Sequence, residues 1–319
     1  IITLMIIMAL ALTVGFAACG GESGKIELQT PTNIRMDGTL LTWDKVENAD
    51  GYMVSVDGVE KLTSKNRYDL SILSLPDTYG VQVMALGDGN KYADSGWSKV
   101  KEYVVEGPEF TFNEQMNGYI VTGIGTITSD EIDVPDAYKG LPVYGIGYRA
   151  FENNEKITKV TLPFYLHVIS TYAFSGCKSL KTVEISHSGK LRYISGYAFA
   201  GCTALESVTL PSCVERIGSG VFAGCTELTD LTLEPGLTLL GEGMFRGDIA
   251  LRVPEFPESL RALPAEVFRD CSAFSRLDLP GSLRSVGRNA FRGCVRLRAV
   301  SAGLGLTEIG AFAFAGCRD

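Results

Sequence analysis

The sequence predicts a mostly β protein in two parts, a β-sandwich over residues 27–106 and then a solenoid with a parallel β-sheet face over residues 130–319. The solenoid is predicted by a motif, A-F-x-G-C, whose Phe recurs at steps of 23, 25, 23, 23, 23, 23 and 23 residues. Such a period indicates one short structural unit per repeat, packed on its neighbours. The sandwich is predicted by short alternating apolar runs between turn signals. The repeated position is held by Phe151, Phe174, Phe199, Phe222, Phe245, Phe268, Phe291 and Phe314.

The first 18 residues are apolar or small, like the hydrophobic region of an export signal. They lead into Ala17-Ala18-Cys19-Gly20, so residues 1–19 resemble a bacterial lipoprotein signal ending in a lipobox. The resemblance implies that Cys19 is lipidated and anchors the chain to the membrane, on the bacterial cell surface outside the cytoplasm. The alternative is an uncleaved transmembrane anchor, since about 18 apolar residues can just span a bilayer. Residues 20–26 are predicted to form a flexible tether.

Residues 27–106 contain alternating runs at 39–43, 51–56 and 79–85, separated by Asp-Gly turn signals. With an early Trp43 and a late Tyr79, this order resembles a fibronectin type III domain. The resemblance implies that Trp43 lies in the core and Tyr79 near the corner of a late strand. It implies no ligand, because a fold of this kind does not specify a function.

The repeats, aligned on their Phe, are apolar five and eight residues before it in every copy. After the Phe comes L-x-x-V-x-L-P, as in residues 205–211. Alternation with a period of two predicts a short strand, which the Pro ends. Stacking the copies would align these strands in a parallel sheet along one face.

This order of motifs resembles the bacterial leucine-rich repeats of the BspA-like group of surface proteins, and the match covers residues 130–319. The resemblance implies that residues 107–129 form a β leader that caps the first coil, as a solenoid requires. No closing cap follows the last repeat, so we interpret the solenoid as truncated at its C-terminus.

Six of the eight cysteines share one position of the repeat, three residues after the Phe. Equivalent side chains of stacked strands point the same way, so we expect buried thiols rather than disulfides. A row of ligands one repeat apart does not form a tetrahedron, so neither a metal site nor a cofactor is predicted. Cys213 lies outside the row and is the expected exposed thiol. The row is Cys177, Cys202, Cys225, Cys271, Cys294 and Cys317.

Two surface columns are candidates for ligand binding. The arginine column, Arg246, Arg269 and Arg292, directly follows the Phe in three coils and could bind acidic polymers, although a solvated ridge partly neutralised by its neighbours is the alternative. Arg246-Gly247-Asp248 also spells an integrin-binding tripeptide, but Asp248 occupies the cysteine position and should point inward. The strand column is the outward position of the predicted strand face. It suits polar contacts with a ligand, and the alternative is a solvated sheet that binds nothing. The column is Thr161, Glu184, Thr209, Thr232, Glu255, Asp278 and Ser301.

A net charge of -8 and a pI near 5 argue against nucleic acid as the main partner. The sequence shows no catalytic constellation, so we do not expect an enzyme. The BspA-like relatives are associated with adhesion, which implies a surface protein that binds extracellular proteins or glycans. Two alternatives remain open: a non-catalytic accessory region of a larger cell-wall or polysaccharide-active enzyme, and a structural spacer.

Overall fold

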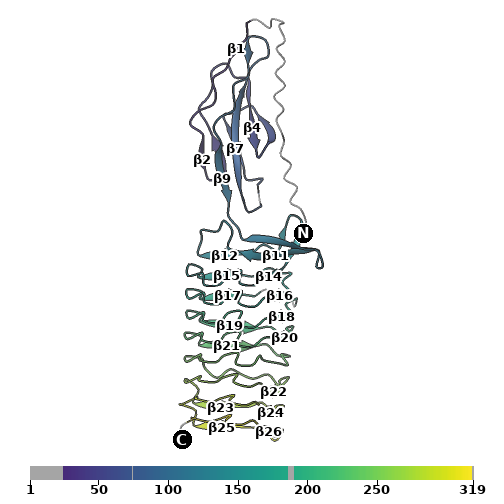
Figure 1. The fold of residues 1–319 in the computed structure, drawn as a ribbon, viewed down its shortest axis with the longest axis vertical. Coiled ribbons are helices and arrows are strands. Elements are labelled where there is room, and N and C mark those ends of the chain that lie inside the picture. Colours follow the sequence, from purple (N-terminus) through teal and green to yellow (C-terminus); the bar gives the residue numbers. More distant parts are fainter. Residues whose placement is uncertain (1–23, 74, 186–189, 318–319) are drawn as a thin grey trace. The chain divides into compact units, whose positions relative to one another are not determined.

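The computed structural model describes residues 24–73, 75–185 and 190–317, and this part of the chain consists of strands and turns without a helix (Figure 1). It forms two compact units, one from residues up to Ile72 with Tyr79–Tyr103 and one from Leu73–Thr78 with the residues after Tyr103. No described segment makes a helix long and apolar enough to span a membrane. The predicted signal and Cys19 lie outside the described residues.

The first unit contains two larger sheets. The buried Trp43 lies edge-on to Tyr52, with ring centroids 5.2 Å apart, and the Tyr52 hydroxyl accepts a hydrogen bond of 2.9 Å from the Val46 N–H. Asp57 and Gly58, both with positive φ, form a two-residue hairpin turn, as this dipeptide favours. The core position expected for Trp43 is confirmed, whereas the fibronectin type III assignment stays a prediction. One sheet has the order β2 (Arg35–Asp37), β3 (Leu40–Thr42), β6 (Arg67–Asp69); the other has β5 (Val59–Thr63), β4 (Gly51–Val56), β7 (Asp77–Leu86), β9 (Lys101–Val105); and β1 (Ile26–Glu27) pairs with β8 (Tyr92–Ala93).

The second unit is the predicted solenoid, with two strand positions in most coils (Figure 1). At its start the hairpin of β10 (Glu109–Asn113) and β11 (Gly118–Gly123) joins the parallel sheet, because β11 pairs with β14. This sheet has the order β10, β11, β14 (Leu141–Ile146), β16 (Val168–Ile169), β18 (Tyr193–Ile194), β20 (Arg216–Ile217), with β13 (Ala137–Tyr138) beside β14; it resumes as β22 (Ala262–Leu263), β24 (Ser285–Val286), β26 (Glu308–Ile309).

The strand face that the L-x-x-V-x-L-P pattern predicts lies in three parallel pieces, in which equivalent residues of successive coils are in register. The sheet is therefore not continuous, and it is interrupted after β17 and after β21. The pieces are β12 (Glu131–Asp133), β15 (Lys159–Thr161), β17 (Thr182–Glu184); β19 (Ser207–Leu210), β21 (Asp230–Leu233); and β23 (Arg276–Asp278), β25 (Ala299–Ser301).

One predicted strand is absent. Residues 251–257, which include Glu255 of the strand column, have no regular secondary structure. The inward position that holds Val208 and Leu231 in the two preceding coils is occupied here by Pro254. Proline has no N–H to donate to a ladder, so pairing stops at this coil. Glu255 is exposed as expected, but it extends from an irregular segment.

The interior of the solenoid is a stack of phenylalanine rings. Neighbouring rings of the repeated Phe are nearly parallel, at interplanar angles of 2–15° and centroid distances of 5.0–5.7 Å. Phe151 to Phe291 are buried, and Phe314 of the last coil is half-buried. The coils are also joined at this corner by the backbone, since the Phe222 N–H donates to the Met244 carbonyl at 2.9 Å and the other coils repeat the bond. The predicted register of the repeats is therefore confirmed.

Candidate functional site

The strand column lies on the outer side of the strand face. Thr161 and Thr209 are half-buried, whereas Glu184, Thr232, Glu255, Asp278 and Ser301 are exposed. Two of its carboxylates form ion pairs across or along the strands. Lys159 Nζ lies 2.8 Å from Glu184 Oε1, which raises the pKa of Lys159, and Arg276 donates to both oxygens of Asp278 at 3.1–3.2 Å. The column is thus polar and partly self-neutralised.

A cleft of about 420 Å³ opens on this face between β17 and β19. It brings together three predicted residues, Thr161, Glu184 and Thr209, and leaves Thr232, Glu255 and Asp278 outside. Its floor is apolar and its rim carries hydroxyl and carboxylate groups. The wall residues are Leu162, Val183, Ile185, Pro211 and Glu234.

The cleft exists because the strand face separates at this point. Among the described residues, β17 and β19 have no paired register, and the Glu206 N–H joins the Lys181 carbonyl at 3.2 Å just before the two strands. The coil between Phe174 and Phe199 is 25 residues long instead of 23, so the repeat spacing changes where the two strands lose their pairing. Beside this break the inward Val183 is half-buried, while Val160 and Val208 on either side are buried.

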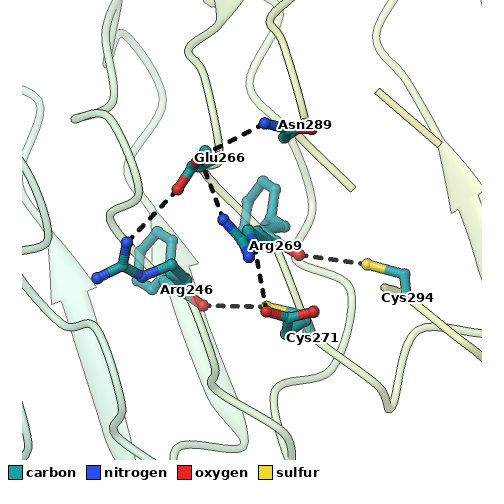
Figure 2. A network of polar contacts seen from close by, with 9 residues as sticks. Arg246, Glu266, Arg269, Cys271, Asn289 and Cys294 are labelled. Atoms are coloured by element: carbon teal, nitrogen blue, oxygen red, sulfur yellow. Dashed lines mark hydrogen bonds and ion pairs between the residues drawn. The ribbon is translucent and has the colours of Figure 1, made fainter. Parts of the chain in front are cut away.

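The arginine column does not form a ridge of isolated charges. Glu266, two residues before the next Phe, lies between two of its members: Arg246 Nη1 is 3.5 Å from Glu266 Oε2 and Arg269 Nη1 is 3.3 Å from Glu266 Oε1 (Figure 2). Arg269 Nε also lies 3.3 Å from Asp270, and Asn289 donates to Glu266 at 3.4 Å. Only Arg292 has no side-chain partner among the described residues. Arg246 and Arg269 therefore fit the alternative in which neighbouring carboxylates neutralise the arginine column.

A third column, exposed or half-buried in five of eight coils, was missed by the sequence analysis. The position two residues before each Phe has a positive φ in all eight coils, and in six of them it is not Gly. Tyr172 and Tyr197 stack there at 5.5 Å, and the guanidinium of Arg149 lies over both Tyr148 and Tyr172 at 5.0 and 5.3 Å. These residues form one column, the turn column, when the repeats are aligned on their Phe. Nothing in the sequence indicated a left-handed backbone at residues as large as tyrosine and arginine. The column is Arg149, Tyr172, Tyr197, Gly220, Gly243, Glu266, Asn289 and Phe312.

The family model for the BspA type leucine-rich repeat region matches residues 145–275 and 261–319 in six copies, which is more than half of the chain. The chain belongs to the BspA-type leucine-rich repeat family. One similar solved structure is the T. pallidum leucine-rich repeat protein TpLRR, which is 25% identical; the match covers 67% of this chain and 89% of that chain, with a TM-score of 0.49. Another is a Bacteroides capillosus leucine-rich repeat protein, which is 30% identical; the match covers 41% of this chain and 97% of that chain, with a TM-score of 0.37. A leucine rich cell surface protein of Faecalibacterium prausnitzii is 21% identical; the match covers 67% of this chain and 80% of that chain, with a TM-score of 0.34. No curated protein matches the chain.

In this BspA-type solenoid the cysteine row points inward, as expected. Cys177, Cys202, Cys225, Cys271 and Cys294 are buried, Cys317 and Cys213 are half-buried, and all seven described thiols are free. Each thiol of the row donates to the carbonyl of a Phe one coil earlier, at Sγ to oxygen distances of 3.0–3.3 Å. Burial raises the pKa of Cys177 and of Cys294 to about 12, so these thiols remain protonated at neutral pH.

Asp248 replaces the cysteine in the Phe245 coil of this BspA-type chain. It is fully buried, so its inward orientation is confirmed and the tripeptide around it does not present a carboxylate to solvent. Burial raises the pKa of Asp248 well above its usual value, and Oδ2 has no hydrogen-bond partner in the described structure. No group of three or more His, Cys, Asp or Glu residues that could hold a metal ion occurs in the described part of the chain.

Proposed function

We propose that this protein is a cell-surface binding protein that recognises extracellular proteins or glycans through the strand face of its solenoid. The observation that carries the proposal is the cleft between β17 and β19, where Thr161, Glu184 and Thr209 from three successive coils meet over an apolar floor. Solenoids bind partners on extended faces of this kind. Membership of the BspA-type family supports a role in protein interaction or adhesion.

The chemistry of the cleft suits a polar segment with a small apolar part. Val183 and Ile185 offer apolar surface, and Thr161 and Thr209 offer hydroxyl groups that donate and accept hydrogen bonds. Pockets of a few hundred Å³ with an apolar lining and a few polar groups are typical ligand sites. Lipid anchoring through Cys19, a predicted modification, would hold such a site outside the cell.

The test is binding of the 319-residue chain to immobilised fibronectin, fibrinogen, collagen and a panel of bacterial and host glycans. Thr209→Tyr fills the cleft with a ring that a strand accommodates, so we expect it to lower binding of any ligand found by about tenfold or more. Thr232→Tyr is the matched control, because Thr232 is the equivalent residue one coil later and lies outside the cleft.

We expect Thr232→Tyr to bind as the wild type does. If both substitutions leave binding unchanged, the strand face is not the binding surface. If the wild-type chain binds none of these ligands, the spacer or the enzyme-accessory alternative replaces the proposal.

A further inference from the structure

The Phe291 coil carries an unusual concentration of arginine. Residues 279–307 contain five arginines and no aspartate, glutamate or lysine. All five side chains belong to exposed residues. The segment therefore has a local charge of +5, in a chain whose net charge is -8. The five are Arg284, Arg288, Arg292, Arg296 and Arg298.

Four of these arginines have no partner for their guanidinium groups. Arg284 donates to the Gly305 carbonyl at 3.1 Å, but no described residue forms a hydrogen bond or an ion pair with the side chains of the other four. The acidic side chains nearest in the preceding coil are already engaged. Glu266 pairs with Arg246 and Arg269 (Figure 2). Asp270 pairs with Arg269 as well.

The backbone that carries these four arginines is held on both sides. They lie on the segment that connects β24 to β25. The Asp270 N–H of the preceding coil donates a hydrogen bond of 2.7 Å to the Arg292 carbonyl of this segment. On the other side the Gly293 N–H donates to the Ala315 carbonyl at 2.9 Å. The residues between the arginines point inward and are buried, namely Asn289, Ala290, Phe291, Cys294 and Leu297.

The described part of the next coil leaves Arg288 and Arg292 exposed. In the next coil the positions equivalent to Arg288 and Arg292 are Ala311 and Ala315, as the backbone hydrogen bonds from Asn289 and Gly293 define the register. Alanine side chains are too short to cover an arginine or to neutralise it. The result is a rigid segment from which several unpaired guanidinium groups extend.

We infer that this segment, from Arg288 to Arg298, is a binding site for an anionic glycan that carries sulfate or phosphate groups along its length. Guanidinium groups form paired hydrogen bonds with sulfate-like and phosphate oxygens, and they are more weakly hydrated than lysine ammonium groups. Several cations on one rigid segment fit a polymer with repeated charges better than a single small anion. The site is separate from the strand face, so it does not depend on the function proposed above.

The test measures binding of the 319-residue chain to fluorescein-labelled dextran sulfate and to poly(glycerol phosphate), with unsulfated dextran as the uncharged polymer. We expect binding to at least one of the two charged polymers, a fall in affinity as salt rises, and no binding to dextran. The triple substitution Arg288→Ser, Arg292→Ser and Arg296→Ser should lower affinity by about tenfold or more, because charge-assisted contacts are lost.

The matched control removes the same charge from elsewhere on the surface: Arg35→Ser, Arg67→Ser and Arg216→Ser are all at exposed positions. We expect this control to stay within about twofold of the wild type, because distant exposed charges are screened. Replacing Arg288, Arg292 and Arg296 by lysine should give an affinity between those of the wild type and the serine triple, since the charge is kept and the bidentate geometry is lost. Thr209→Tyr should leave polyanion binding unchanged.

Three results would overturn the inference. The first is absence of binding to both charged polymers by the wild type. The second is an equal loss of affinity in the two serine triples, which would show a general charge effect. The third is tighter binding of a single-stranded DNA of similar charge than of either glycan-like polymer, which would point to nucleic acid. Circular dichroism and the unfolding midpoint show whether each triple is folded.

Discussion

Asp248 Oδ1 accepts a hydrogen bond of 2.8 Å from the backbone N–H of Cys225. This contact places a carboxyl group in a row of thiols that each donate a hydrogen bond to a Phe carbonyl. The thiol of Cys271, one coil later, makes such a bond to the Phe245 carbonyl at 3.1 Å. A carboxylate has no proton to donate, so the charged form of Asp248 satisfies this position poorly.

We expect Asp248→Cys to stabilise the protein at pH 7. The folded state raises the pKa of Asp248, so its contribution to stability is most favourable below the unfolded pKa of 3.8 and is lost as pH rises through the folded pKa. The substitution should increase the free energy of unfolding by about 1 to 3 kcal/mol at pH 7 and by less at pH 4. Urea unfolding at both pH values measures the difference. Asp248→Asn should show the same trend, and an equal gain at both pH values would contradict the buried-charge explanation.

Substitution of Phe222 by Ala should open a cavity in the ring stack. Phe222 is buried between Phe199 at 5.3 Å and Phe245 at 5.7 Å. Loss of such a side chain costs about 3 to 5 kcal/mol. Phe314→Ala provides the comparison, because Phe314 is half-buried and stacks on Phe291 alone among the described rings. An unfolding midpoint for the Phe222 variant that matches the wild type would contradict the ring stack.

Two glycines of the turn column should differ in their tolerance of Ala. Gly220 and Gly243 have φ of 62° and 56°, so Ala at either position costs about 1 kcal/mol in the backbone. A Cβ at Gly220 would also lie 2.5 Å from Tyr197 Cε1, whereas at Gly243 the nearest atom is 4.0 Å away. Gly220→Ala should therefore cost about 1 to 3 kcal/mol more than Gly243→Ala in thermal or urea unfolding. In a Tyr197→Ala background the difference should disappear, and its persistence would assign the clash to another group.

The described thiols should react in a fixed order in the native protein. Cys213 is half-buried and lies outside the row, whereas Cys202, Cys225 and Cys271 are buried and burial raises the pKa of each. Because the thiolate is the reactive form, iodoacetamide should modify Cys213 first and the three buried thiols only after unfolding. Mass spectrometry of peptides from native and urea-treated protein checks the order. Early modification of Cys225 in folded protein would show that its coil opens readily.

The periodic parts of this fold could be predicted from the sequence, because the interior repeats with the chain. The positions of Phe222 and Cys225 follow from a 23-residue period, and so does the inward orientation of Asp248. The strand at Glu255 was predicted wrongly because the apolar alternation continues there, whereas Pro254 prevents the backbone pairing. Local sequence pattern does not report such pairing.

The candidate site was predicted less well. Its three central residues, Thr161, Glu184 and Thr209, were among the predicted ones, but the cleft between them lies where β17 and β19 do not pair, and the repeat pattern does not indicate that break. The pairing of Glu266 with Arg246 and Arg269 joins residues 20 and 3 positions apart. It requires the stacking of one coil on the next and the backbone conformation of the turn column, which an alignment of repeats does not contain.

The left-handed backbone two residues before each Phe is imposed by the coil and not by the side chain, since Arg149, Tyr172, Glu266 and Phe312 all adopt it. Five of the eight members of this column, Arg149 and Tyr172 among them, are exposed or half-buried, whereas Gly220, Gly243 and Asn289 are buried. At the five exposed or half-buried positions, a substitution changes what the protein presents to its surroundings and removes no ring from the stack. One repeated backbone conformation thus carries outward side chains as different as those of Arg149 and Phe312.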